Sequence, residues 1–360
     1  MSSVSHLTVR GFKSIAALER FELGSLNVLI GPNGAGKSNL LGVFRMLSAM
    51  AHRRLQVFVA QEDGPDALLF QGREETHVIE IEYEVGEHAY YAGFEPAGQH
   101  LTISHEGSRS EARSISLGGG YESNVLVPEG PEIDAIASFL RERIAGWRVY
   151  HFSNTTMNAK IRQAQPVRDN VRLHQDGSNL GPFLRYLRER YPANHRSVVD
   201  SIRLVAPYFG DFYHRSNPGE RVELEWCERS DQETLSSRIL GPRQLSDGLL
   251  RFICLSTLLN QPVELQPDPI LIDEPELGLH PAALAILAAL LDRASEARQV
   301  IVSTQSAGLV NDFKPEDVVV AERQDGASSF RRVDPESLSI WLDDYALGDL
   351  WMMNVIGGRP

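Results

Sequence analysis

The residues Gly31-Pro-Asn-Gly-Ala-Gly-Lys-Ser38 have the spacing G-x-x-x-x-G-K-[ST], which is typical of a loop that binds the phosphates of a nucleotide. Glycines let the backbone curl tightly, so that consecutive N–H groups and a helix N-terminus face one anion. Lys37 would reach the β- and γ-phosphates, and the hydroxyl of Ser38 would bind Mg²⁺. The loop residues that we expect to bind ATP and its metal are Asn33, Gly34, Gly36, Lys37, Ser38 and Asn39.

The segments on both sides of this phosphate-binding loop (P-loop) fit such a site. Residues 26–30 (LNVLI) are typical of a short buried strand, and residues 37–50 carry apolar side chains at helical spacing. The alternative is a structural glycine turn with a capping Lys-Ser pair. The strand before the loop and the helix after it favour the nucleotide site.

Two adjacent carboxylates, Asp273 and Glu274, end the apolar run that begins at Pro269. A buried parallel strand would deliver both side chains to the crevice that holds the P-loop. We expect Asp273 to hold Mg²⁺, directly or through water. Glu274 is expected to orient and deprotonate the attacking water, because phosphoryl transfer needs mainly positioning and charge neutralisation. The alternative is an acidic strand end that caps a helix.

The run Gln244-Leu-Ser-Asp-Gly-Leu-Leu-Arg251 opens an apolar helix that continues to about Leu259. Ser246 and Gly248 at its N-terminus would form a second phosphate-binding surface. Taken alone, L-S-x-G is also typical of an ordinary helix cap. Its place one helix before Asp273 favours the signature of an ATP-binding cassette.

Five segments together resemble an ABC-type ATPase head of the RecF/SMC/OLD group, among proteins often called AAA-family ATPases. They are Val9-Arg-Gly-Phe-Lys-Ser14, the P-loop, the Ser246 segment, Ile270 to Pro281 (ILIDEPELGLHP) and Val300-Ile-Val-Ser-Thr-Gln-Ser306. The resemblance implies an α/β fold: a P-loop NTPase core like that of ABC ATPases, with an antiparallel β-subdomain and a helical subdomain. The run from Glu274 to Pro281 is more similar to OLD-type and stand-alone ATPases than to RecF, and we expect no fused Toprim nuclease.

The same resemblance implies a homodimer in which two heads enclose two ATP molecules. Ser246 and Gly248 of one head would then meet the γ-phosphate that the P-loop of the other holds. The segment Glu276–His280 would cross that interface as the D-loop. Lys13 could place a second positive charge near the phosphates, or it could be a surface lysine after a turn.

The chain departs from the family pattern after the strand of residues 299–303. ABC ATPases usually carry a switch histidine there, whereas this chain has Gln305. Glutamine can bond a γ-phosphate or a water, but it cannot carry the charge of an imidazole. We therefore expect slow hydrolysis with a γ-phosphate sensor at Gln305, or a glutamine that only bonds nearby backbone. For the Q-loop glutamine, Gln163 and Gln165 are candidates.

Composition sets broad limits on compartment and partners. The chain has 360 residues, 42% of them hydrophobic and 23% charged, which is ordinary for a globular protein. No apolar run approaches the ~20 residues that span a bilayer, so no membrane partner is expected. The two cysteines, Cys227 and Cys254, are not spaced as a metal-binding pair, which favours a reducing cytoplasm.

Positive charge is concentrated in one segment. The net charge is −13, yet residues 141–196 carry eleven Lys and Arg against four Asp and Glu. These cations could be solvated helix faces, or they could track the phosphates of DNA or RNA. The aromatic residues interleaved with them, which could stack on bases or contact a protein, are Trp147, Tyr150, Phe152, Tyr186 and Tyr191.

We expect a single head of residues 1–360. Residues 1–60 and 241–335 are predicted to form the nucleotide-binding core, 75–125 a β-rich lobe and 131–210 a helical basic lobe. Within these, residues 77–103 alternate like antiparallel strands, 104–131 have the composition of a loop, and helices are predicted at 131–145, 179–191 and 194–207. Residues 221–240 are interpreted as two further strands. No sustained heptads occur, so no long coiled-coil arm is expected.

Two classes of function fit these expectations. The first is an ATP-dependent dimerising switch in DNA repair, genome maintenance or anti-phage defence, which acts on DNA or controls an effector such as a nuclease or toxin. The second is the ATPase subunit of a transporter. A third, an ATP-binding scaffold that barely hydrolyses, is kept open by Gln305.

Overall fold

The computed structural model describes residues 3–110, 114–123, 143–217, 219–229 and 238–359. Its centre is a sheet with the strand order β17–β16–β3–β15–β14–β8, in which all pairs except β16–β17 are parallel. The strands are β3 (Leu26–Ile30), β8 (Arg148–Tyr150), β14 (Ile270–Asp273), β15 (Val300–Ser303), β16 (Val318–Gln324) and β17 (Ala327–Arg332).

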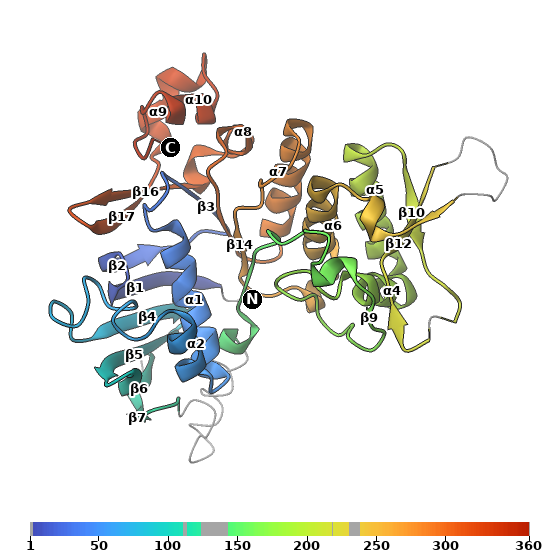
Figure 1. The fold of residues 1–360 in the computed structure, drawn as a ribbon. Helices are drawn as coiled ribbons and strands as arrows, with labels where there is room; N and C mark the ends of the chain where they lie inside the picture. The colour runs from blue at the N-terminus through green and yellow to red at the C-terminus, as the bar shows by residue number, and fades with distance from the viewer. Residues whose placement is uncertain (1–2, 111–113, 124–142, 218, 230–237, 360) are drawn as a thin grey trace.

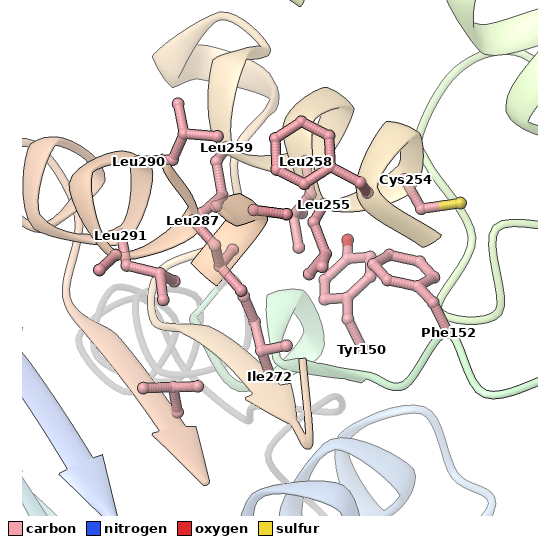
Figure 2. Close-up of a cluster of buried hydrophobic side chains, with 14 of the residues drawn as sticks. Tyr150, Phe152, Cys254, Leu255, Leu258, Leu259, Ile272, Leu287, Leu290 and Leu291 are labelled. Atoms are coloured by element: carbon pink, nitrogen blue, oxygen red, sulfur yellow. The ribbon is translucent and has the colours of Figure 1, made fainter. Parts of the chain in front are cut away.

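The central sheet is covered on both faces, which explains why β3 and β15 are buried along their whole length. Alternate residues of each strand belong to different cores. Val28 and Val302 pack with the helices on one face, and Leu29 and Ile301 pack with α1 on the other. Figure 2 shows part of the first core, where leucines of α6 and α7 meet Ile272 of β14.

The helices lie around this sheet, with α1 and α2 on the side of the antiparallel sheet and α4 to α7 on the other side (Figure 1). Their bounds are α1 (Lys37–Ala51), α2 (Leu55–Gln61), α4 (Leu180–Arg190), α5 (Pro192–Val205), α6 (Asp247–Asn260), α7 (Pro281–Ser295), α8 (Ala307–Val310), α9 (Pro335–Leu342) and α10 (Leu347–Met352). The helices predicted at 179–191 and 194–207 are confirmed as α4 and α5. Most of the predicted helix 131–145 lies outside the described residues.

A second sheet is antiparallel, with the order β2–β1–β4–β5–β6–β7. Its strands are β1 (Val4–Phe12), β2 (Ile15–Glu22), β4 (Ile79–Val85), β5 (His88–Ala97), β6 (His100–Ser110) and β7 (Ser114–Gly120). Alternate residues of β4 are buried, as its alternating sequence predicts. Residues 1–60 are predicted to belong to the nucleotide-binding core. β1 and β2, which lie in that range, are instead strands of the antiparallel sheet.

The prediction of a loop over 104–131 is wrong for β6 and β7. β6 pairs with β5 from His100 to Ser110, so the backbone is bonded although the side chains are polar. Gly107 permits the pairing of β6 with β7, because a Cβ there would lie 2.6 Å from the carbonyl oxygen of Ile115 on β7.

Short strands complete the helical side of the molecule. β10 (Phe209–Tyr213), β12 (Glu225–Glu228) and β13 (Ile239–Leu240) form one sheet, and β9 (Gln165–Pro166) pairs with β11 (Arg221–Val222). Residues 230–237, in the middle of the region predicted as two strands, lie outside the described residues. In the part of the chain that is described, no helix is long and apolar enough to cross a bilayer.

Candidate nucleotide-binding site

The P-loop connects the end of β3 to the start of α1, as the sequence predicts. Gly31, Gly34 and Gly36 have φ values of 147°, 79° and 106°, which side-chain-bearing residues rarely adopt. The hairpin β16–β17 packs against the loop so closely that a Cβ on Gly31 would lie 2.2 Å from the carbonyl oxygen of Ala321. Glycine is therefore required here by backbone conformation and by the close approach of the hairpin.

Lys37 lies inside the curl of the loop and is 5% exposed. Its ammonium donates hydrogen bonds to the carbonyl oxygens of Gly31, at 2.5 Å, and Pro32, at 3.0 Å. Burial lowers the pKa of Lys37, and the nearby carboxylates, led by Glu274, act in the opposite direction. A phosphate entering the loop would give this buried cation a counter-charge that carbonyl oxygens do not supply.

Three oxygen-bearing side chains meet at the C-terminal end of β14. The hydroxyl of Ser38 is 3.3 Å from Oδ1 of Asp273, and the hydroxyl of Ser303 on β15 donates to the same oxygen. Mg²⁺ in nucleotide sites typically uses one or two protein oxygens, completed by phosphates and water. Ser38 and Asp273 fit that donor set. Among the described residues, no cluster of three His, Cys, Asp or Glu side chains could hold a metal by itself.

Glu274 and Gln305 form a pair beside the P-loop. The side-chain amide of Gln305 donates to the carboxylate of Glu274, and the backbone N–H of Gln305 donates to Glu276 at 2.7 Å. Burial raises the pKa of Glu276. Glu274 has φ 49° and its N–H bonds the carbonyl of Ser303 at 3.0 Å, so its backbone is held in an unusual conformation.

The P-loop, Glu274 and Gln305 line one cavity of about 240 Å³, whereas Asp273 does not line it and lies behind Ser38, which it contacts. Its walls are Asn33, Gly34, Ala35, Gly36, Lys37, Ser38, Asn39, Glu274, Gln305 and Arg323. Larger cavities elsewhere in the molecule contain none of the P-loop residues. The P-loop cavity is therefore where the predicted phosphate, metal and water chemistry converges.

Arg323 is a member of this site that the sequence alone did not reveal. It lies on β16, almost 290 positions after the P-loop, and its guanidinium reaches the carbonyl of Gly34 at 3.5 Å and that of Gly326 at 3.1 Å. In the described part of the chain no carboxylate pairs with it. The only sequence signal for Arg323 is that the apolar strand β16 ends in polar residues.

Some predicted residues have other partners. Lys13 is not brought to the cavity, because its ammonium is 2.5 Å from the carboxylate of Glu62. Asn39 lines the cavity, but its amide donates to the hydroxyl of Ser14 at 2.7 Å. Gln163 and Gln165 donate to backbone carbonyls of their own loop and do not line the cavity.

Ser246 and Gly248 are not part of their own chain's P-loop cavity. Ser246 caps α6 by accepting the N–H of Leu249 at 3.2 Å. Gly248 lies against the predicted D-loop, since a Cβ there would lie 2.2 Å from the carbonyl oxygen of Gly278. The signature segment and the D-loop thus form one packed unit.

A buried arginine fixes the signature segment of this unit. The side chain of Arg162 is 2% exposed, and its guanidinium donates to the carbonyls of Thr155 at 2.7 Å and Leu245 at 3.1 Å, to that of Pro242, and to the carboxylate of Asp247 at 2.7 Å. A cation of the basic segment therefore has a structural role, which charge counting does not reveal.

The aromatic residues of the basic segment are mostly core residues. Trp147, Tyr150 and Phe152 are buried, and Trp147 packs edge-on against Phe44 and Tyr83. Tyr186 and Tyr191 pack partly against the first core. The expectation that this aromatic set stacks on nucleic-acid bases is therefore wrong for the three buried members.

A known protein family matches most of this chain. The family described as "AAA domain, putative AbiEii toxin, Type IV TA system" matches residues 26–89 and 94–311. A search of curated proteins finds no match.

Solved structures show the same fold. An Smc head bound to the C-winged helix domain of ScpA is 16% identical with a TM-score of 0.57, over 94% of this chain and 99% of that one. A second Smc head, with an extended coiled coil and bound to the C-terminal domain of ScpA derived from Pyrococcus furiosus, is 13% identical with a TM-score of 0.57, over 96% and 99%. The predicted ABC-type P-loop fold is confirmed. Because the family match covers most of the chain, this protein belongs to the AAA-domain family whose description names a putative AbiEii toxin of a type IV toxin–antitoxin system.

Proposed function

We propose that this chain is a Mg²⁺-dependent ATPase that works as an ATP-dependent dimerising switch for a partner effector. The observation that carries the proposal is the single cavity shared by the P-loop, Glu274 and Gln305. Lys37 and the loop N–H groups bind the phosphates, and Ser38 and Asp273 hold Mg²⁺, which neutralises charge on the transferred group. Glu274 takes the proton of the attacking water, while Gln305 orients Glu274 and contacts the γ-phosphate.

The proposed dimer rests on the exposed signature serine. Ser246 and Gly248 present a helix N-terminus, which favours an anion, yet they lie outside their own P-loop cavity. A second head would bring that end of α6 to ATP. The D-loop, packed against Gly248, would cross the same interface.

An effector protein is the partner that we favour. The matched family is described by a putative toxin of a type IV system, which favours a role in defence over one in repair. Both similar Smc heads are described as bound to a domain of ScpA, so heads of this fold do carry partner domains. The free thiols of Cys227 and Cys254 suit a reducing cytoplasm.

Two variants test the enzyme. Lys37→Ala should abolish ATP binding in a fluorescence titration, because it removes the buried cation of the loop. Glu274→Gln should bind ATP normally and hydrolyse it ~10²–10⁴ times more slowly, which is the usual contribution of a general base. Arg73→Ala, which changes an exposed arginine paired with Asp66, is the control. Parent-like turnover in Glu274→Gln would contradict the proposed role of Glu274. If the parent protein did not hydrolyse ATP, the ATP-binding scaffold would be favoured. If it dimerised with ATP but no effector protein bound to it, the transporter subunit would remain as the alternative function.

Nucleic acid is a second candidate partner, favoured by two basic cavities that share Arg148. They have volumes of about 450 and 620 Å³, and their other basic side chains include Arg45, His52, Arg54 and Arg172. Burial and the nearby Arg172 lower the pKa of Arg148, and neither arginine has a carboxylate partner within the described ranges. A phosphate backbone would relieve this repulsion.

Salt dependence tests the nucleic-acid candidate. Labelled single- and double-stranded DNA and RNA should bind at low salt, with affinity that falls steeply as salt rises. Arg148→Glu with Arg172→Glu should weaken that binding, and Arg73→Glu should not. Absence of binding at low salt, with and without ATP, would exclude this candidate.

A further inference from the structure

The end of α9 exposes a run of large apolar side chains. Ile340 is 84% exposed and Trp341 is 43% exposed, and Leu342 and Tyr345 are also exposed. The rings of Trp341 and Tyr345 lie 6.2 Å apart, so these side chains form one surface. We call the four residues Ile340, Trp341, Leu342 and Tyr345 the α9 surface.

This exposure is unusual for the chain. The other three tryptophans, Trp147, Trp226 and Trp351, are at most 2% exposed, so Trp341 is the only one at the surface. Single exposed apolar residues are normal, but four large ones within six positions are not. Aromatic side chains are enriched where proteins bind one another, because they bury much apolar area at low entropic cost.

The stretch of chain that carries the α9 surface is acidic. From Val333 to Gly358 the sequence contains no Lys, Arg or His. The carboxylates of this stretch are Asp334, Glu336, Asp343, Asp344 and Asp349. All five are exposed, and none makes an ion pair with a described residue. The short helix Pro315–Asp317, which contacts α9, adds Glu316 and Asp317, and the exposed Lys314 before it is a cation on the same side.

An occupant of this surface must therefore combine apolar side chains with positive charge. An identical α9 surface from a second copy would bring like charges together, which costs free energy. An amphipathic helix with lysines or arginines beside its apolar face satisfies both requirements.

The segment that follows the α9 surface in the chain reaches the nucleotide site. The indole N–H of Trp351 in α10 donates to the carbonyl of Gly358 at 2.5 Å, and the N–H of Gly358 donates to Glu322 at 2.8 Å. Glu322 precedes Arg323 in β16, and a Cβ on Gly358 would lie 3.7 Å from the Cα of Gly31. Figure 1 shows α9 and α10 together at the C-terminal end of the chain, beside the hairpin β16–β17.

We propose that the α9 surface, with its acidic rim, is the docking site for a basic amphipathic helix of a partner protein. Only one part of this inference rests on the proposed function: that the partner is the effector which the switch controls. Docking itself needs neither ATP binding nor turnover.

Trp341 makes the proposal testable with a synthetic probe, an 18-residue amphipathic helix of leucine and lysine without tryptophan. Docking should shift the tryptophan emission of the full chain to shorter wavelength and reduce its quenching by acrylamide. The same peptide with glutamate in place of lysine should cause neither change. A fluorescein-labelled copy gives the affinity by anisotropy, and that affinity should fall as salt rises.

Three variants locate the binding. Asp343→Lys with Asp344→Lys should weaken the peptide at least tenfold, and Ile340→Ser with Trp341→Ser should do the same. Glu74→Lys with Glu75→Lys, an exposed acidic pair elsewhere, is the matched control and should bind like the parent. Thermal unfolding confirms that each variant is folded, which is expected because the changed side chains are exposed.

Equal affinity for the parent and the Asp343→Lys, Asp344→Lys variant would overturn the proposal, as would unchanged quenching of Trp341. It would also be overturned if the nucleotide-free parent were a dimer in light scattering that Ile340→Ser makes monomeric, since a second copy would then cover the surface. Lys37→Ala should bind the peptide normally, so failure of the ATPase proposal and failure of this one are distinguishable.

Discussion

The side-chain amide of Gln305 donates a hydrogen bond to the carboxylate of Glu274, across the ends of the neighbouring strands β14 and β15. Gln305 itself is held by Glu276, which accepts its backbone N–H at 2.7 Å. The residue at the switch position therefore orients the proposed general base directly. An uncharged donor there leaves Glu274 free to accept a proton.

This pair predicts the behaviour of two variants of Gln305. Gln305→Ala should lower turnover without loss of ATP affinity, because Glu274 loses its orienting bond. Gln305→Glu puts two carboxylates in contact, so one of them keeps a proton to higher pH. The acid limb of the pH–rate profile should then move to higher pH. Steady-state rates between pH 5 and 9 check this, and a profile that matches the parent would mean that Gln305 does not act on Glu274.

Arg323 should contribute to ATP affinity. It faces Gly34 in the P-loop cavity and has no carboxylate partner among the described residues. A hydrogen bond from a charged group is worth about 1.5–3 kcal/mol, so Arg323→Ala should weaken ATP at least about tenfold. Arg323→Lys should recover part of that loss because it keeps the charge. Titrations with ATP and ADP, with Arg73→Ala as control, measure the effect, and parent-like affinity in Arg323→Ala would exclude a phosphate contact.

The contact between Gly248 and Gly278 should control dimerisation. Glu274→Gln with ATP should trap a dimer visible in light scattering. Ser246→Arg should prevent it by steric clash and charge. Gly248→Ala should also weaken it, because the added Cβ would lie 2.2 Å from the carbonyl oxygen of Gly278 and displace the D-loop.

Gly146→Ala is the matched control for that series, since nothing lies within 4 Å of its added Cβ. A dimer that forms without ATP and survives Ser246→Arg would point to a different interface.

Arg162 should stabilise the signature segment. Arg162→Met leaves the carbonyls of Thr155, Pro242 and Leu245 without their donor. An unsatisfied buried polar group costs about 1–3 kcal/mol, so the free energy of unfolding should fall by roughly 3 kcal/mol. Arg221→Met, which removes one bond from an exposed arginine to the carbonyl of Ala164, should have a smaller effect. Urea denaturation compares the two, and equal losses would show that Arg162 has no special role.

The sequence by itself determined the P-loop, because glycine conformations, Lys37 and Ser38 belong to one short contiguous segment with its own strand and helix. It also predicted that the apolar run ending at Asp273 is a buried parallel strand, and that residues 299–303 form a strand. These local patterns grouped Asp273 and Glu274 with the P-loop, and the fold class followed from the resemblance to ABC-type ATPase heads.

Only the tertiary structure decided the remaining features, because they depend on contacts between distant segments. Strand pairing made β6 and β7 regular although their residues are polar, and core packing buried Trp147, Tyr150 and Phe152. The same long-range packing placed Arg323 at the P-loop cavity and paired Lys13 with the carboxylate of Glu62. A cation's partner depends on which surface the fold places opposite it, and no local pattern contains that information.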